Sequence, residues 1–372
     1  MQIIFLDHNA TTKLAPEALK KMNEVYQFPL NNSSIHQLGR QAKNLVETAR
    51  SILQNLLNAK NYEITFTSSS TEATNNVIFG SSCDKILFSA IEHSSVFNCR
   101  PEHKKIIEIA SLENGLISLE DLKNQLEKLE DANFLVSVML ANNETGAIQP
   151  IAEISKLVHQ KGGLLHCDIV QAVGKIEVDL EKLNVDFASI SAHKLNGPQG
   201  VGALLTRKGF EIKPLIFGGK QEKSKRAGTV NVAGVAGFGV ACELADKRIS
   251  EYENVKKMRD FLEEQIAKIA GDDVKIFSQN VPRLPNTSYI ALKNVSSQTQ
   301  LINFDLNGIC VSAGPACSSG STSEESRVLK AMNIAPEFSK SAIRVSLGKE
   351  TKNEEITKFI TVWQQFYQKI KN

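Results

Sequence analysis

Lys194 stands in a tight connection between two apolar runs, where its amine could form a covalent bond to a carbonyl compound. Residues 187–190 predict a buried strand, 196–200 a turn, and 201–205 a second apolar strand. A lysine that forms a Schiff base must first lose its proton, and partial burial favours the neutral amine. A surface lysine on a turn is the alternative, and Lys194 alone does not decide between them.

A carboxylate closes another apolar run upstream of Lys194. Residues 163–167 predict a strand that ends at Asp168, and Gln171 follows shortly after. Pyridoxal phosphate works as an electron sink only while its ring nitrogen carries a proton, and a neighbouring aspartate keeps that proton in place. Asp168 and Lys194 at neighbouring strand ends would suit this cofactor, although a single aspartate there also serves as a cap or turn residue.

Hydroxyl side chains follow a third apolar run, at residues 64–66. Residues 67–71 read Thr-Ser-Ser-Ser-Thr and lead into a predicted helix. Small hydroxyl residues at a strand-to-helix turn offer backbone N–H groups, hydroxyls and the helix dipole to a phosphate. By itself the turn is an ordinary helix start, but together with Lys194 and Asp168 it favours a pyridoxal-phosphate site.

With these stretches in place, the chain resembles the cysteine desulfurases of the NifS/IscS type, within the class V aminotransferase group of pyridoxal-phosphate enzymes. The similarity runs almost from end to end. Each motif alone is weak, but nine occur in the family's order and spacing. They are residues 6–12, 32–36, 92–93, 142–146, 168–171, 191–194, 227–229, 316–320 and 343–346.

The resemblance implies the α/β architecture of aminotransferase fold type I, in which a large domain has a mainly parallel, mixed sheet wrapped by helices. A smaller α+β domain accompanies it. We expect the large domain at 15–250, and the small domain at 1–14 together with 251–372, with a catalytic cysteine loop at about 313–326. Apolar runs that alternate with helical segments favour the same sheet. They predict strands at 64–66, 85–89, 106–109, 134–140, 164–166, 187–191 and 202–205.

Further elements follow from periodicity. Helical spacing predicts a helix at about 41–57 and one long helical region at about 232–269. Strands are expected at 274–277, 288–292, 308–312 and 343–346. In the last helix, Ile356, Phe359, Trp363 and Ile370 share one face, which predicts core packing.

By this resemblance, Lys194 holds the cofactor as an internal Schiff base and, once the substrate amine has displaced it, moves the Cα proton. Asp168 pairs with the ring nitrogen and Gln171 hydrogen-bonds the phenolic oxygen. His93 stacks on the ring and shuttles protons, although a lone histidine after a strand is more often a capping residue.

The resemblance also implies how phosphate and substrate are held. The phosphate ligands that it implies are Thr71, Ser191, His193 and, reaching across a homodimer interface from the partner subunit, Thr229. Ser70, in the hydroxyl-rich turn, is also expected to bind the cofactor. Asn9, Asn143 and Arg344 match the groups that hold the substrate carboxylate, and Asn143 also contacts the cofactor. A guanidinium suits this task because its fork binds a carboxylate at two points.

Cys317 is implied as the sulfur acceptor. Its thiolate attacks the sulfur of L-cysteine, which leaves a persulfide on Cys317 and releases L-alanine. The Gly- and Ser-rich flanks suit a mobile loop that hands sulfur to an iron–sulfur scaffold or another acceptor protein. No resident metal is expected, while transient ligation of an iron–sulfur cluster by Cys317 stays open.

The chain departs from the family pattern near these residues. Ser69 stands where glycine is usual, and a positive φ there would cost about 1 kcal/mol or more. Ser70 replaces an alanine, Lys220 a common glycine, and Pro315 a serine just before the nucleophile. Two alternatives follow: another class V enzyme such as a selenocysteine lyase or aminotransferase, or a weakly active paralogue that serves as an assembly platform.

The bulk composition excludes several other classes. Lys plus Arg total 43 and Asp plus Glu 41, so a net charge of +2 gives no reason to expect a nucleic acid or an anionic membrane as partner. No apolar run approaches membrane-spanning length, and the apolar start stops at Asp7 without a basic region. The expectation is a cytoplasmic protein. Five cysteines in apolar or mixed contexts predict small core residues: Cys83, Cys99, Cys167, Cys242 and Cys310.

Overall fold

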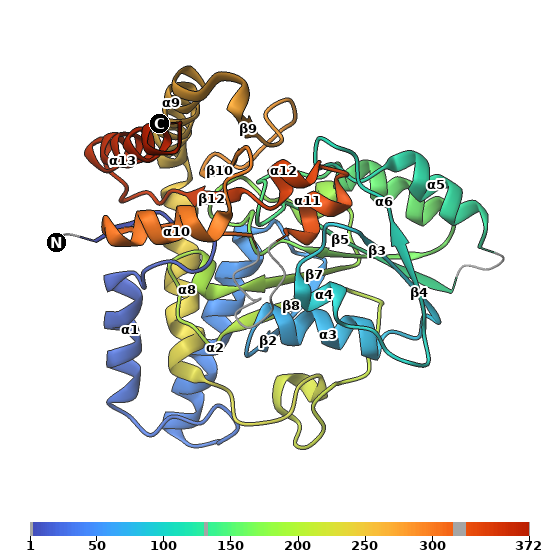
Figure 1. The fold of residues 1–372 in the computed structure, drawn as a ribbon. Helices are drawn as coiled ribbons and strands as arrows, with labels where there is room; N and C mark the ends of the chain where they lie inside the picture. The colour runs from blue at the N-terminus through green and yellow to red at the C-terminus, as the bar shows by residue number, and fades with distance from the viewer. Residues whose placement is uncertain (1–2, 130–132, 315–324, 372) are drawn as a thin grey trace.

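The computed structural model describes residues 3–129, 133–314 and 325–371 of the chain. Its centre is a seven-stranded sheet in the order β2-β8-β7-β6-β5-β3-β4 (Figure 1). The neighbours from β7 through β6, β5 and β3 to β4 are parallel, whereas β8 runs antiparallel to both β2 and β7. This confirms the mainly parallel, mixed sheet and its seven predicted strands, which are β2 (Tyr62–Thr67), β3 (Lys85–Ser89), β4 (Lys105–Ile109), β5 (Phe134–Met139), β6 (Leu164–Asp168), β7 (Phe187–Ser191) and β8 (Gly202–Arg207).

Strand periodicity separates the two faces of this sheet. Phe187 packs in the same core as α3 (Ser70–Gly80) and α4 (Ser94–Phe97), while its neighbour Ala188 packs on the opposite face. Leu204 and Leu205 divide in the same way. Because helices cover both faces, the strands read as continuous apolar runs. The opposite face is covered by α2 (Gln37–Leu56), α5 (Leu119–Glu127), α6 (Ile151–Gln160) and α8 (Val232–Lys247).

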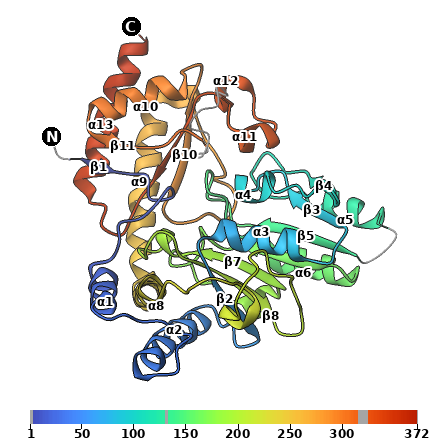
Figure 2. The ribbon, with the colours of Figure 1, turned by 90° about the horizontal axis from the view of Figure 1, so that it is seen from below.

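Two helix predictions need correction. The helix expected from residue 41 begins at Gln37, because the His36 side chain caps it by accepting from the N–H of Gly39. The single helical region expected at 232–269 is two helices, α8 and α9 (Tyr252–Ala270), joined by a 3-10 turn at Ile249–Glu251. The reason is burial: α8 is built of small residues against α1 (Pro16–Tyr26) and α2, whereas α9 packs against α13 (Asn353–Lys371) (Figure 2).

The C-terminal part has its own sheets and its own core. β12 pairs antiparallel with β10, which pairs antiparallel with β9, and β1 pairs parallel with β11. Leu6 of the N-terminal segment is fully buried in this core. The domain boundaries stay a prediction, which these separate cores support. The strands are β1 (Ile4–Phe5), β9 (Val274–Ile276), β10 (Thr287–Leu292), β11 (Ile309–Cys310) and β12 (Ala342–Ser346); the helices not yet bounded are α7 (Leu180–Leu183), α10 (Ser297–Leu306), α11 (Arg327–Ala331) and α12 (Pro336–Ser339).

Burial tests the predicted core residues. Trp363 is fully buried as predicted, but Ile370, near the end of α13, is 42% exposed, so its place on the core face was wrong. Four of the five cysteines predicted as core residues are buried, and Cys310 is half-buried. Within the described residues, no helix is both long enough and apolar enough to cross a bilayer.

Candidate active site

The carboxyl ends of three parallel strands meet at one edge of the large sheet. β5 ends at Met139, four residues before Asn143, β6 ends at Asp168, and β7 ends at Ser191, just before Lys194. Ligands of such sheets bind at this edge. Two further groups close the site. One is the segment of residues 7–10, which pairs with β12 although it lies near the N-terminus, and the other is Arg344 of β12 itself.

Lys194 ends the 3-10 turn Ala192–Lys194 and is half-buried. Its Nζ donates to the backbone oxygens of Asn9 at 2.6 Å and Ala10 at 2.7 Å. The chain's first segment therefore lies directly against the amine. This confirms the tight connection at a strand end and excludes the alternative of a fully exposed turn lysine.

Asp168 is buried at the end of β6. One carboxylate oxygen, Oδ1, accepts from the N–H of Val170 at 2.9 Å. Burial raises the pKa of Asp168 to about 6, against the opposing effects of that hydrogen bond and of Lys194. A carboxylate in this position gains from a cation placed beside it, and a protonated ring nitrogen is such a cation.

The turn after β2 forms a cradle. Ser69 has φ −169° and ψ 166°, and its Oγ accepts from the N–H of Glu72 as the N-cap of α3. The strain considered for Ser69 is thus absent, because no positive φ is needed. Ser70 is buried at the first position of the helix, and its Oγ has no hydrogen-bond partner among the described residues. A Cβ on Gly202 would lie 2.6 Å from the carbonyl carbon of Ser69, so glycine there permits the close approach.

The turn and its surroundings fit a phosphate. An unpartnered buried hydroxyl at a helix N-terminus is what an anion would satisfy. Thr71 is exposed at the same turn, and Ser191 is buried at the end of β7. The ring nitrogen Nδ1 of His193 lies 3.1 Å from the Oγ1 of Thr11. Burial, and then Lys194, lower the pKa of His193 to about 4, so it is neutral at pH 7.

His93 is the N-cap of α4. Its Nδ1 accepts from the N–H of Ser95 at 3.1 Å and lies 2.9 Å from the Oγ of the same residue. Burial first, then Lys194 and Arg327, lower the pKa of His93 to about 4. His93 is therefore a neutral imidazole with its proton on Nε2. The capping role considered for His93 is thus present in the structure.

Arg344 is buried beneath the first segment of the chain. It donates to the backbone oxygen of Asn143 at 3.0 Å and forms an ion pair with Asp7 at 2.7 Å. Its Nε has no partner among the described residues. Asn9 lies between these groups and donates from Nδ2 to the backbone oxygen of Asn143 at 3.2 Å. The three predicted substrate-binding residues are thus brought together.

The structure also shows residues that sequence reasoning missed. Asp7 pairs with Arg344, and Glu92 is fully buried with one oxygen, Oε2, unpartnered in the described chain. Asp7 lies within the motif at residues 6–12 and Glu92 within that at 92–93, so these motifs were the sequence signal that could have identified them. Lys175 is buried against Gln171 and Asn9, and no motif pointed to it.

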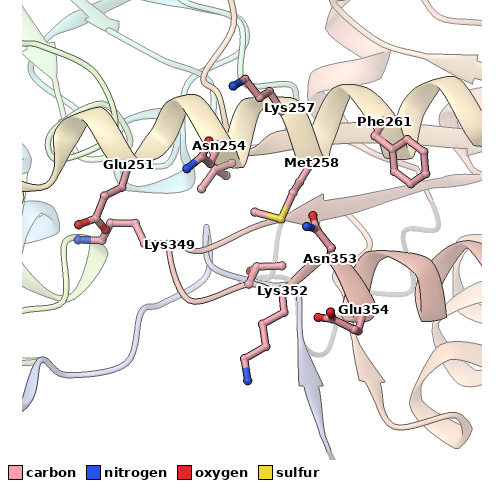
Figure 3. Close-up of a pocket in the computed structure, with 11 residues that line it drawn as sticks. Glu251, Asn254, Lys257, Met258, Phe261, Lys349, Lys352, Asn353 and Glu354 are labelled. Atoms are coloured by element: carbon pink, nitrogen blue, oxygen red, sulfur yellow. The ribbon is translucent and has the colours of Figure 1, made fainter.

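Two predicted site residues stand apart. Cys317 lies outside the described residues, as does most of the predicted loop at 313–326. Thr229 is exposed and lines a small cavity with Thr67, Ser68 and Arg226. A separate, larger cavity of about 740 Å³ lies between α9 and the segment before α13, where Met258, Lys349 and other side chains border it (Figure 3). It contains none of the predicted site residues.

Comparisons with known proteins agree with this arrangement. The family model described as Aminotransferase class-V matches residues 4–359. The cysteine desulfurase IscS of Dictyoglomus turgidum is 39% identical, with 99% of this chain and 95% of that protein covered. The cysteine desulfurase of Enterobacter agglomerans is 38% identical over 96% of this chain and 90% of its own length. The solved NifS-like protein of Rickettsia africae superposes with a TM-score of 0.92 at 40% identity, covering 99% and 100% of the two chains.

The chain therefore belongs to the class V aminotransferase family, and it is an enzyme of that fold. Within the family it falls among the cysteine desulfurases of the NifS/IscS type, as its motifs predicted. These enzymes depend in general on pyridoxal phosphate. The buried Asp168, the amine of Lys194 and the Ser70 hydroxyl, which has no hydrogen-bond partner among the described residues, fit that cofactor.

Proposed function

We propose that this enzyme takes the sulfur of L-cysteine with bound pyridoxal phosphate and Cys317, and releases L-alanine. The sulfur would supply iron–sulfur cluster assembly and other acceptor proteins. The observation that carries the proposal is the convergence of Lys194, Asp168 and the Ser70 hydroxyl, unpartnered within the described residues, at one edge of the sheet.

The residues at this edge divide into those that hold the cofactor and those that move protons. When bound, pyridoxal phosphate supplies an electron sink for the charge left when the substrate Cα loses its proton. Asp168 would hold the proton on the ring nitrogen, and Gln171 would donate to the phenolic oxygen. Lys194 would hold the cofactor through its amine and would carry the Cα proton of the substrate. His93, neutral with Nε2–H, suits stacking against the ring.

The phosphate would be held by backbone and hydroxyl donors of the turn after β2. Ser70 is the member with direct support, because its buried hydroxyl has no partner in the described chain. Thr71, Ser191 and His193 complete the proposed set. His193 is neutral at pH 7 and would contribute a hydrogen bond rather than a charge.

Arg344 would bind the substrate carboxylate together with Asn143 and Asn9. Its Nε has no partner in the part of the chain that the structure describes, and its ion pair with Asp7 shows that the side chain already binds one carboxylate. Both observations support this role. A substrate carboxylate must therefore share or replace the Asp7 contact. The ion pair with Asp7 would hold the guanidinium in place before substrate arrives.

The choice of Cys317 as sulfur acceptor is supported by the environments of the other five cysteines. Burial raises the pKa of Cys83, Cys167 and Cys242, and that of Cys99 to about 11, so these groups stay as thiols. Burial also raises the pKa of Cys310. Because the thiolate is the nucleophile, none of the five suits the attack on sulfur.

A homodimer would complete the site. Thr229 follows a segment with three exposed apolar side chains, Leu215, Ile216 and Phe217, and Phe217 is 81% exposed. We propose that a second copy covers this segment and receives Thr229 at its phosphate site. Exposed apolar side chains near an exposed ligand residue support such an interface.

Two substitutions test the proposed reaction. Wild type with pyridoxal phosphate should show a visible absorption band and release alanine and sulfide from cysteine in the presence of a thiol. Lys194→Ala should lose the band and all turnover, since no covalent bond to the cofactor can form. Cys317→Ala should keep the band but form little alanine, with Cys310→Ala as the matched control that keeps activity. Mass spectrometry that finds the added sulfur on a peptide without Cys317 would refute the assignment.

A further inference from the structure

Lys175 is a buried lysine that the proposed reaction does not use. It is only 2% exposed. Its Nζ donates to Oε1 of Gln171 at 2.7 Å and to Oδ1 of Asn9 at 3.0 Å. No carboxylate pairs with it in the part of the chain that the structure describes. Burial, and then Lys194 and Arg344, lower the pKa of Lys175. A buried amine without a counter-ion is costly to keep, so its contacts call for an explanation.

These contacts fix the orientation of the Gln171 amide. Nζ approaches Gln171 as a donor, so the atom that faces it must be the carbonyl oxygen Oε1. The NH2 group then points the other way and donates to the backbone oxygen of Asn9 at 3.0 Å. In an inverted amide, the NH2 group of Gln171 would face Nζ of Lys175, and Oε1 would face the backbone oxygen of Asn9. Both hydrogen bonds would then be lost. Gln171 is thus held with its second N–H unused by these contacts.

The same lysine fixes the amide of Asn9. Oδ1 of Asn9 also accepts from Asn286 at 3.0 Å, while Nδ2 donates to Thr287 at 2.9 Å. Asn9 in turn supplies the one backbone oxygen that accepts from both Gln171 and Lys194. One buried donor therefore contacts two side-chain amides at the candidate active site: that of Gln171, and that of Asn9, which Asn286 and Thr287 also orient.

We propose that Lys175 is a positioning residue: by donating to Gln171 and Asn9, it holds the Gln171 NH2 toward the phenolic oxygen of bound pyridoxal phosphate. The inference rests on the proposed function, since it needs the cofactor beside Gln171. The other charged or titratable groups around Lys175 are His8, Lys194 and Arg344. Without Lys175, the hydrogen bond to the backbone oxygen of Asn9 still favours this orientation, but the amide loses one of its two restraints. It can then invert in part of the molecules, in which the cofactor oxygen loses its donor.

The effect of the Gln171 donor can be measured in a pH titration of the visible band of the bound cofactor, whose midpoint is the pH at which half of the change has occurred. A donor stabilises negative charge on the phenolic oxygen and favours loss of the proton that the oxygen shares. Lys175→Met should therefore raise the midpoint by about one pH unit, a tenfold change in the acid dissociation constant, as should Gln171→Ala. If Lys175 acts through Gln171, Lys175→Met should add nothing in the Gln171→Ala background.

A matched control removes a buried lysine elsewhere. Lys104 donates only to Ser81 in the described chain, at 2.6 Å and 3.1 Å, and Ser81 is not one of the predicted site residues. Lys104→Met should leave the midpoint at the wild-type value. An unchanged midpoint in Lys175→Met, or a shift that is equally large with and without Gln171, would overturn the inference.

A second variant covers the case in which Lys175→Met does not fold. In Lys175→Arg the new side chain also carries only hydrogen-bond donors. A wild-type midpoint in this variant supports the inference, whereas a midpoint equal to that of Gln171→Ala overturns it. A wild-type protein that shows no visible band after incubation with pyridoxal phosphate would instead refute the proposed function, and the inference with it. The two failures are thereby distinguished.

Discussion

Asp168→Asn should stabilise the cofactor-free protein while it nearly stops the reaction. Asp168 is buried at the sheet edge, and its Oδ1 accepts one backbone hydrogen bond, from Val170. Asparagine has the same shape and keeps that acceptor, but it carries no charge at any pH. It cannot hold the proton on the ring nitrogen of the cofactor, so Cα deprotonation should fall by about 100-fold or more.

The size of the stability gain follows from the pKa of Asp168. The folded carboxyl keeps its proton up to about pH 6, whereas an unfolded one loses it near 3.8. Between these values the folded state binds more protons, so the free energy of unfolding falls as pH rises. A difference of about 2 pH units corresponds to about 3 kcal/mol, lost in full above pH 6 and restored below 3.8. Asp168→Asn avoids this loss.

Urea unfolding of the cofactor-free proteins at pH 7.5 and pH 4 measures the effect. The variant should be more stable than wild type by up to about 3 kcal/mol at pH 7.5, and the two should converge at pH 4. Asp186→Asn is a matched control of opposite sign. That buried carboxylate accepts from the N–H of Leu165 and lies 2.8 Å from Nε2 of His159, so its loss should destabilise. A variant at Asp168 with wild-type stability at pH 7.5, or wild-type single-turnover formation of alanine, would refute the reasoning.

Two further substitution tests separate binding from folding. Ser69→Ala should lower the free energy of unfolding by about 1 kcal/mol, because the helix loses its cap, whereas Ser70→Ala should leave it unchanged. Conversely, Ser70→Ala should weaken pyridoxal phosphate binding about tenfold in a fluorescence titration. If the two variants changed stability to a similar extent, the assignment of Ser69 as cap and Ser70 as phosphate ligand would be contradicted. Arg344→Lys should raise KM for cysteine at least about tenfold, because one ammonium cannot replace the fork between Asp7 and a carboxylate; an unchanged KM would exclude Arg344 from substrate binding.

Local pattern was enough to predict the sheet edge. Each of the seven strands is an apolar run of the right length, and the run before Asp168 or Lys194 predicts a strand end there. Because the ends of parallel strands meet at one edge, the proximity of these residues follows from topology. Residue roles came from the resemblance, and they stay predictions.

Other features depend on packing that no local pattern encodes. The break at Ile249–Glu251 is invisible in periodicity, because both flanking segments are good helices and only their tertiary partners differ. Ser69 was compared with a glycine pattern, although a cap needs no positive φ. The ion pair of Arg344 with Asp7 joins residues far apart in sequence and depends on how β1 and β12 come together.

The N-terminal segment links the two halves of the site. The N–H of His8 donates to the backbone oxygen of Ser346, so the segment belongs structurally to the C-terminal part. The next residue, Asn9, contacts Lys194 and Gln171 on the large sheet through its backbone oxygen. Any shift of the C-terminal part would therefore move Arg344 and the carbonyls that hold the Lys194 amine together. The position of the carboxylate-binding group and the orientation of the amine are thus set by one segment, and neither can change alone.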